Sequence, residues 1–333
     1  DELFSARPDE AALSALLDDW ARHHDMEGAV LAVGTPWADP LVVANGVDAE
    51  GAPRDTATAI EVQSVTKLFT ANGVHRLAMV GLLDLDAPIP ALAAYPDFPH
   101  PQLTPRQLLA HRSGLANYWD IPRYQDDPLS LATPLDAVRA VAEQPLEFEV
   151  DTRSAYSSTN YLLLGLVVEE IVGLPFDAVL DALVLEPFAL ASVAHLPPEP
   201  GLPRGATGGI QSTMGDLVAA VAGLVREPFG LDEPARARLF DLDADSGIGP
   251  GVNGFCPCEQ DDEGGVRWFG LGYTGGSTIA LHLPESDLVV ALDLTETLWV
   301  DDHITAALQL LEDLTAFDWS VPVVDDGAEA VPA

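Results

Sequence analysis

Apolar residues recur at helical spacing near both ends of the chain. Between Leu13 and Trp20 they stand at positions i, i+3, i+4 and i+7, and a comparable stripe runs from Ile304 to Leu314. This spacing places the apolar side chains on one face of an α-helix, which can then pack against a core. The sequence therefore predicts an amphipathic helix near each end of the chain.

Short apolar runs lie next to these two helices and predict strands. The second run ends at Asn45-Gly46, a turn pair, and the last two runs enclose a turn at residues 284–287. From about residue 66 to 225 the spacing is mainly helical, with proline-rich connections. Strands at both ends with helices between them favour an α/β (α+β) fold, in which an antiparallel sheet is flanked by the terminal helices and a helical lobe is inserted. The predicted strands are residues 29–33, 41–44, 277–283 and 288–294.

The same pattern suggests how the domain is organised. A chain of 333 residues is long enough for one large domain or two lobes. We expect a single domain over residues 1–320, with a sheet lobe of about 1–63 and 255–320 and a helical lobe of about 64–254. Residues 321–333 contain acid, proline and glycine without periodicity, which predicts a flexible tail.

Charge excludes two classes of partner. The chain has 53 acidic and 15 basic side chains, and its formal net charge is −38. Nucleic acids and anionic membrane surfaces attract basic proteins, so we expect neither as a partner. Two explanations of the acidity stay open, adaptation to high salt and stability at low pH in a secreted protein. Salt adaptation is favoured because lysine is depleted while acid is enriched.

The two cysteines suggest no cofactor chemistry. Cys256 and Cys258 are separated by one proline, so a disulfide between them would close a small, strained ring. No histidine lies close by in sequence to complete a metal site. We therefore expect two loop thiols without a role, no metal and no cofactor.

The expected location is extracytoplasmic or secreted. No apolar run reaches the roughly 18 residues that a membrane helix needs, and the chain begins at Asp1, which fits the removal of a signal peptide or tag. The cytoplasm of a salt-adapted cell stays open as an alternative.

A single lysine stands out in this chain. Lys67 lies three residues after Ser64, and the other 14 basic side chains counted in the chain are arginines. At the start of a helix this spacing brings the hydroxyl and the amine together on one face. Lysine can lose its proton and act as a base, whereas a guanidinium effectively cannot. The pair therefore predicts a serine nucleophile activated by a lysine.

Seven segments, in sequence order, resemble the serine β-lactamase and D-alanyl-D-alanine carboxypeptidase superfamily. The resemblance is to the branch that holds class C β-lactamases, D-peptidases and related esterases, and it covers most of the chain. It implies the fold expected above, a β-lactamase-like catalytic domain. The segments are residues 62–70, 81–88, 108–115, 156–165, 186–190, 208–217 and 272–276.

The resemblance also implies roles for individual residues. Ser64 would form an acyl-enzyme, with Lys67 and Tyr156 on its hydroxyl as base and proton shuttle. The backbone N–H groups of Ser64 and Gly276 would form the oxyanion hole. Thr274 and Gly275, with Ser158 and Tyr273, occupy the substrate-binding positions of the family's motifs. His111, in a turn between helices, is expected to be structural.

Two of these positions depart from the family pattern. Ser158 stands where the family has asparagine, and Tyr273 stands where it has histidine or lysine. Both changes weaken the case for substrates that carry a carboxylate. Arg267 or Arg153 could restore the missing positive charge, and the sequence does not place either one.

Three functions therefore remain open. The favoured one is a serine hydrolase that cleaves an ester or amide, possibly a D-amino-acid peptide, so the expected partner is a small-molecule or peptide substrate. The alternatives are a class C-like β-lactamase and a penicillin-binding sensor with little turnover. The sequence indicates no oligomeric state.

Overall fold

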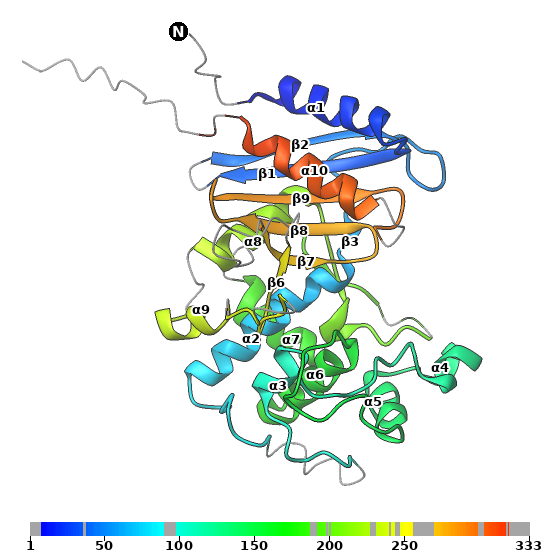
Figure 1. The fold of residues 1–333 in the computed structure, drawn as a ribbon, viewed down its shortest axis with the longest axis vertical. Helices are drawn as coiled ribbons and strands as arrows, with labels where there is room; N and C mark the ends of the chain where they lie inside the picture. Colours follow the sequence, from blue (N-terminus) through cyan, green and yellow to red (C-terminus); the bar gives the residue numbers. More distant parts are fainter. Residues whose placement is uncertain are drawn as a thin grey trace, which may run out of the picture.

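The structure of the chain is a computed structural model, and it places an antiparallel sheet above a group of helices (Figure 1). The parts of the chain described are residues 8–35, 38–89, 98–186, 192–197, 199, 201–226, 231–239, 241–243, 247–255, 270–298, 303–317 and 319. The predicted tail, both cysteines, Arg267 and residues 187–190 of the fifth family segment lie outside these ranges.

The sheet combines strands from both ends of the chain, as the sequence predicts. Among the described residues it has six strands in the order β2-β1-β9-β8-β7-β6, and neighbouring strands are antiparallel. All four predicted strands are present as β1, β2, β8 and β9. The strands are β1 (Gly28–Thr35), β2 (Ala38–Gly46), β6 (Asn253–Phe255), β7 (Gly270–Thr274), β8 (Thr278–Leu283) and β9 (Leu288–Leu294).

The central strands are apolar on both faces because helices cover both sides. Along β1, Leu31 and Val33 pack in one core cluster and Val30 and Ala32 in the other, as the two-residue period of a strand requires. The first cluster lies under the terminal helices α1 (Glu10–His23) and α10 (His303–Thr315), which confirms both predicted helices.

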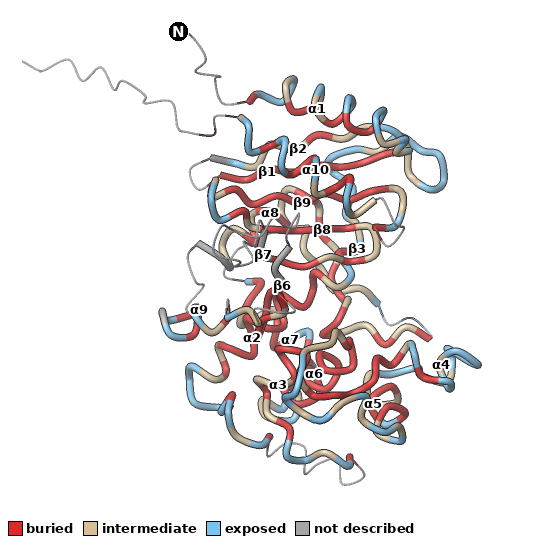
Figure 2. Tube along the Cα trace, in the orientation of Figure 1, coloured by how far each residue is buried: buried red, intermediate tan, exposed pale blue. Residues whose placement is uncertain are grey.

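The opposite face of the sheet packs on α8 and continues into the helical half. Helix α8 (Met214–Arg226) contacts β1, β8 and β9, although its residues fall within the predicted helical lobe. Figure 2 shows burial concentrated in the central strands and in the helices below them. The boundaries of the two lobes stay a prediction.

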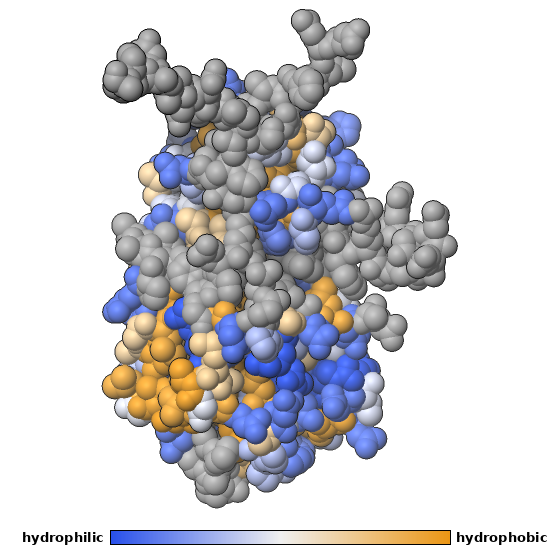
Figure 3. Space-filling model, turned by 90° about the vertical axis from the view of Figure 1, so that its left-hand side faces the viewer, coloured by the Kyte–Doolittle hydropathy of each residue, from blue (hydrophilic) through white to orange (hydrophobic). Residues whose placement is uncertain are grey.

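Helices below β7 form the second half of the molecule. The central one, α6, is buried over most of its length and ends at Gly173, whose φ of +75° suits glycine. Figure 3 shows apolar side chains gathered over the lower part of one face. The helices are α2 (Thr66–Met79), α3 (Pro105–Leu109), α4 (Pro122–Asp126), α5 (Pro134–Ala142), α6 (Ser158–Val172), α7 (Phe176–Leu180), the π-helical turn η4 (Asp181–Leu185) and α9 (Glu233–Leu239), with 3-10 turns η1 (Gln63–Val65), η3 (Pro128–Ser130) and η6 (Gly205–Thr207).

A small second sheet joins the two halves. Within the described residues it has three strands in the order β3-β5-β4. Its middle strand pairs with β3 immediately before Ser64, so it sets where the chain enters α2. The strands are β3 (Ile60–Glu61), β4 (Ala194–His195) and β5 (Ile210–Ser212).

Candidate active site

Ser64 lies at the junction between the two halves, in the 3-10 turn that leads into α2. The chain is anchored just before it, because the Val62 N–H donates to the Ile210 carbonyl at 3.1 Å. The Thr66 hydroxyl accepts from the Ile210 N–H at 3.3 Å, which ties the first turn of α2 to the same strand. The Val65 N–H donates to the Val62 carbonyl at 3.0 Å, so the 3-10 turn that carries Ser64 is closed by its own backbone.

The structure brings the three predicted catalytic residues together. Lys67 Nζ donates to Ser64 Oγ at 2.9 Å, and Tyr156 OH lies 2.8 Å from the same oxygen. Ser64 and Lys67 come from adjacent turns, and Tyr156 comes from the segment just before α6. A serine hydroxyl in hydrogen-bond contact with two possible proton acceptors has the geometry of an activated nucleophile.

Lys67 is buried without an ionic partner among the described residues. Its side chain is 0% exposed, and it also donates to the Thr207 carbonyl at 2.9 Å. Burial lowers its pKa, against the opposing effect of the Tyr156 phenolate and hydrogen bond. Removal from water disfavours the ammonium form, so a neutral amine becomes accessible at lower pH than for a lysine in water.

Tyr156 has the complementary shift. Burial acts to raise the pKa of its phenol, but the Lys67 charge and hydrogen bonds from Lys67, Ser158 and Ser64 together lower it. Ser158 Oγ donates to the phenol oxygen at 3.3 Å. Both groups therefore give up a proton at lower pH than they would in water.

A buried polar network holds Tyr156 in place. His111 Nδ1 accepts from the Ser157 N–H at 3.1 Å, and the Asn117 side-chain oxygen accepts from the Ser158 N–H at 3.0 Å. Burial, followed by the charge of Lys67, lowers the pKa of His111 to about 3. The imidazole is therefore neutral, with its proton on Nε2, and serves as a fixed acceptor, in line with its expected structural role.

Tyr273 belongs to this network and does not line the cavity. It is 1% exposed, its hydroxyl accepts from His111 Nε2 at 3.2 Å, and it donates to Tyr161 OH at 3.2 Å. The sequence predicts a substrate-binding role for this residue, and its position argues against direct contact. Because a neutral imidazole and a second phenol satisfy the hydroxyl, burial at this position is compatible with tyrosine.

The turn that carries the second predicted oxyanion donor packs against the backbone of Ser64. A Cβ added to Gly275 would stand 3.2 Å from the Ser64 nitrogen. Thr274 ends β7, and neither it nor Gly275 is among the residues that line the cavity. Gly276 lines the cavity together with Ser64. Its N–H donates to the Gln63 side-chain oxygen at 2.5 Å.

These residues open onto a cavity of about 610 Å³. Part of its wall is aromatic, formed by Tyr118, Trp119 and Tyr156, and the Trp119 and Tyr156 rings stack with centroids 6.5 Å apart. This volume and lining suit an apolar group of a small-molecule substrate. The lining residues are Glu61, Gln63, Ser64, Asn117, Tyr118, Trp119, Tyr156, Ser158, Leu202, Arg204, Thr207, Gly208 and Gly276.

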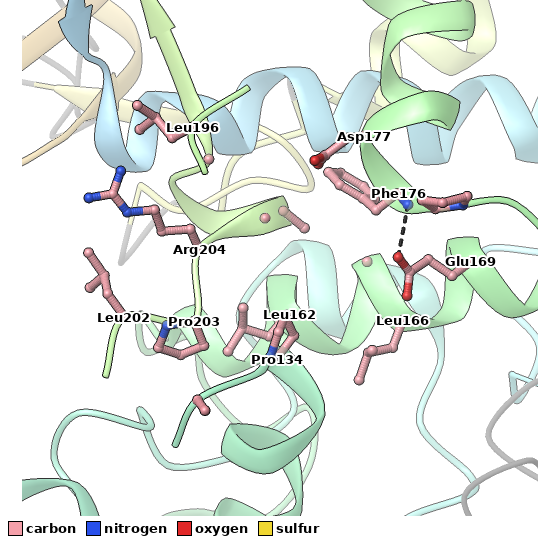
Figure 4. A pocket seen from close by; sticks show the side chains of 16 residues that line it. Pro134, Leu162, Leu166, Glu169, Phe176, Asp177, Leu196, Leu202, Pro203 and Arg204 are labelled. Atoms are coloured by element: carbon pink, nitrogen blue, oxygen red, sulfur yellow. Dashed lines mark hydrogen bonds between the residues drawn. The ribbon is translucent and has the colours of Figure 1, made fainter. Parts of the chain in front are cut away.

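Arg204 separates this cavity from a smaller one of about 260 Å³, shown in Figure 4. The guanidinium points away from the apolar side chains of that cavity. One Nη donates to Glu61 at 2.9 Å, and the other pairs with Glu199. Two carboxylates therefore neutralise the arginine at the rim of the larger cavity.

The sequence gives no sign of several residues that border the nucleophile. Tyr118, Trp119 and Arg204 lie outside the family motifs, and Arg204 meets Glu61 from 143 positions away. Gln63 is adjacent to Ser64, and that adjacency was the only available signal. Arg153, considered as a positive charge for the substrate, lies 4.2 Å from the centroid of the Phe148 ring and does not line the cavity.

Within the described ranges, no cluster of three or more metal-ligating side chains is present. Over the same residues, no helix combines the length and apolar character that a membrane span needs.

Known proteins resemble the chain in both sequence and fold. Esterase EstB of Burkholderia gladioli is 33% identical over 210 residues, which cover 57% of this chain and 52% of that protein. Penicillin-binding protein 4 of Amycolatopsis lactamdurans is 30% identical over 197 residues, covering 57% of this chain and 50% of that protein. The chain thus spans about half the length of these curated relatives.

A solved structure extends the likeness to the whole fold. The D-amino acid amidase of Ochrobactrum anthropi SV3, in complex with L-phenylalanine, matches with a TM-score of 0.74 at 21% identity, over 92% of this chain and 98% of that one. The family model described as Beta-lactamase matches residues 12–314. The chain belongs to the Beta-lactamase family.

Proposed function

We propose that the chain is a serine hydrolase that cleaves an ester or amide through an acyl-enzyme on Ser64. The observation that supports this most strongly is the pair of contacts on Ser64 Oγ, 2.9 Å from Lys67 Nζ and 2.8 Å from Tyr156 OH. Membership of the family supports the same chemistry, as do the relatives named as an esterase and an amidase.

Each proton in the proposed reaction has a place to go. Neutral Lys67 takes the proton of Ser64 as its oxygen attacks the carbonyl carbon, and the developing oxyanion is held by the N–H groups of Ser64 and Gly276. Tyr156 donates its proton to the leaving oxygen or nitrogen as the bond to carbon breaks, and Lys67 reprotonates the phenolate. Water then attacks the acyl carbon and gives a proton to Lys67, and a proton returns to Ser64 Oγ as the acid leaves, which restores the free enzyme. Loss of one oxyanion donor would cost about 100-fold or more in rate.

The charges around the cavity favour substrates without a carboxylate. Among the described residues that line it, Arg204 is the one arginine, and both of its Nη atoms are engaged by Glu61 and Glu199. Lys67 lies beneath the nucleophile with its ammonium form disfavoured. The Trp119 and Tyr118 side chains offer an apolar surface instead. We therefore expect an apolar acyl group, neutral or bearing an amine.

Replacement of the nucleophile tests the proposal. Ser64→Ala should lose the mass adduct of a fluorophosphonate and the hydrolysis of p-nitrophenyl butyrate, with an unchanged circular dichroism spectrum. Ser130→Ala, a serine away from the cavity, is the matched control and should keep both. An adduct on the Ser64→Ala protein would overturn the assignment.

The alternatives predict other results with the same sample. Steady hydrolysis of nitrocefin would favour a β-lactamase. A stable penicillin adduct without turnover of either substrate would favour a penicillin-binding sensor.

A further inference from the structure

Gln63 has an unusual backbone conformation immediately before the nucleophile. Its φ is +46°, in the left-handed region that non-glycine residues seldom adopt. Such conformations persist when surrounding contacts hold them, and they concentrate at functional sites. Here the conformation turns the glutamine side chain back over the loop that follows β7.

The side-chain carbonyl of Gln63 occupies a donor of the proposed oxyanion hole. Its Oε1 accepts from the Gly276 N–H at 2.5 Å. A glutamine amide has the same carbonyl group as an amide substrate. The free protein therefore already holds a carbonyl oxygen on the N–H that would bind the carbonyl of the substrate.

The loop beside Gln63 accommodates the glutamine side chain because residues 275 and 276 carry no side chains of their own. A Cβ on Gly275 would lie 2.7 Å from Gln63 Cβ, and a Cβ on Gly276 would collide with the Gln63 amide. Glycine at both positions is thus what allows the amide to rest against the loop.

The Gly276 peptide is fixed, so Gln63 is the part that can move. The Gly276 carbonyl accepts from the Leu298 N–H at 2.7 Å and from the Thr297 hydroxyl at 2.9 Å. The Gly275 N–H donates to the Thr278 carbonyl at 2.6 Å. By contrast, Gln63 is exposed and also lines a neighbouring groove of about 540 Å³, which can receive its side chain.

We propose that Gln63 is a resident competitor for the oxyanion hole, displaced each time a substrate carbonyl binds. This inference rests on the proposed function, because it takes Gly276 as the oxyanion donor. The glutamine lowers reactivity toward carbonyls that are weak acceptors and keeps the donor satisfied when no substrate is bound. A net protein hydrogen bond corresponds to a change of about 3- to 10-fold in an equilibrium constant.

Gln63→Met tests the competition, because methionine keeps the length of the side chain and removes the strong acceptor. It should raise kcat/KM for p-nitrophenyl butyrate by about 3- to 10-fold, mainly through a lower KM, and tighten binding of phenylboronic acid by a similar factor. Gln63→Gly, which also relieves the positive φ, should act in the same direction. Gln63→Glu keeps an acceptor and adds a charge, so its kcat/KM should fall below that of the wild type. A decrease or no change in both Met and Gly variants would overturn the proposal.

An NMR measurement separates this inference from the proposed function. In the free protein, the Gly276 amide proton should shift upfield in Gln63→Met, because its hydrogen bond is lost. Absence of that shift would overturn the resident contact, whatever the activity. A clear shift, in a protein whose Ser64 takes no fluorophosphonate, would instead overturn the proposed function.

Discussion

The two cations nearest to the nucleophile and to the rim of the cavity lie in opposite environments. Behind Ser64, Lys67 is fully buried and pairs with no carboxylate among the described residues, so burial lowers its pKa. At the rim, Arg204 pairs with Glu61 and Glu199. It keeps its positive charge, but both Nη atoms already bind carboxylates of the protein. Lys67 therefore loses its proton more readily than a lysine in water, and Arg204 is less able to bind an anionic substrate. The contrast connects the proposed chemistry with the proposed choice of substrate.

The largest effect should come from changing the buried cation, Lys67. Lys67→Arg keeps a positive charge but removes the base, because a guanidinium stays protonated. The value of kcat/KM for p-nitrophenyl butyrate should fall about 1,000-fold, within the range typical of general-base catalysis. A variant that retains more than about a tenth of the activity would assign the proton transfer to Tyr156 instead.

The pH dependence of kcat/KM in the wild type also tests whether Lys67 is the base. A lysine in water has a pKa of about 10.4, and burial shifts that of Lys67 downward. The base is active once deprotonated, so kcat/KM should rise with pH through a limb whose midpoint lies below about 10.4. Lys67→Arg should lack this rise. A rise in the wild-type rate centred at about pH 10.4 or above would contradict the lowered pKa.

The elements that long local patterns define were predictable from the sequence. Continuous apolar runs identify β1 and β9, and helical spacing identifies α1 and α10, because burial on the sheet follows the strand and helix periods. Strands β3, β4 and β5 were not predicted. They have two or three residues each, and β3 pairs with β5 across about 150 positions of the chain.

In the candidate site, too, local sequence patterns predicted some residues, and tertiary contacts determine the positions of the others. Ser64 and Lys67 are neighbours on a helix, so local spacing is sufficient to pair them. Tyr156 was found through the resemblance. The positions of Tyr273 and Arg204 depend on tertiary contacts, with His111 and Tyr161 for the first and with Glu61 for the second. No local pattern encodes such contacts.

A moderate effect is expected at the rim. Glu61→Gln removes one of the two carboxylates on Arg204, so a substrate carboxylate can compete for the guanidinium. The ratio of kcat/KM for the p-nitrophenyl monoester of succinic acid to that for p-nitrophenyl butyrate should rise about threefold to fivefold, the range of a partly exposed ion pair. Glu143→Gln, at the C-terminal end of α5, is the control. An unchanged ratio would mean that neutralisation of Arg204 does not exclude carboxylates.

The smallest expected effect is on stability in salt, and it tests the acidity of the whole surface. With a net charge of −38, repulsion between surface carboxylates should be substantial in dilute buffer. At 1 M potassium chloride the Debye length falls to about 3 Å, so this repulsion is screened. The same salt weakens exposed ion pairs such as the one between Arg22 and Asp19, but these pairs contribute little. The melting temperature should therefore rise by a few degrees, and activity should persist because Lys67 is buried away from the ions.

Chloride is the suitable anion, since sulfate also strengthens apolar burial. A flat or falling melting temperature would contradict salt adaptation and leave stability at low pH as the explanation to test.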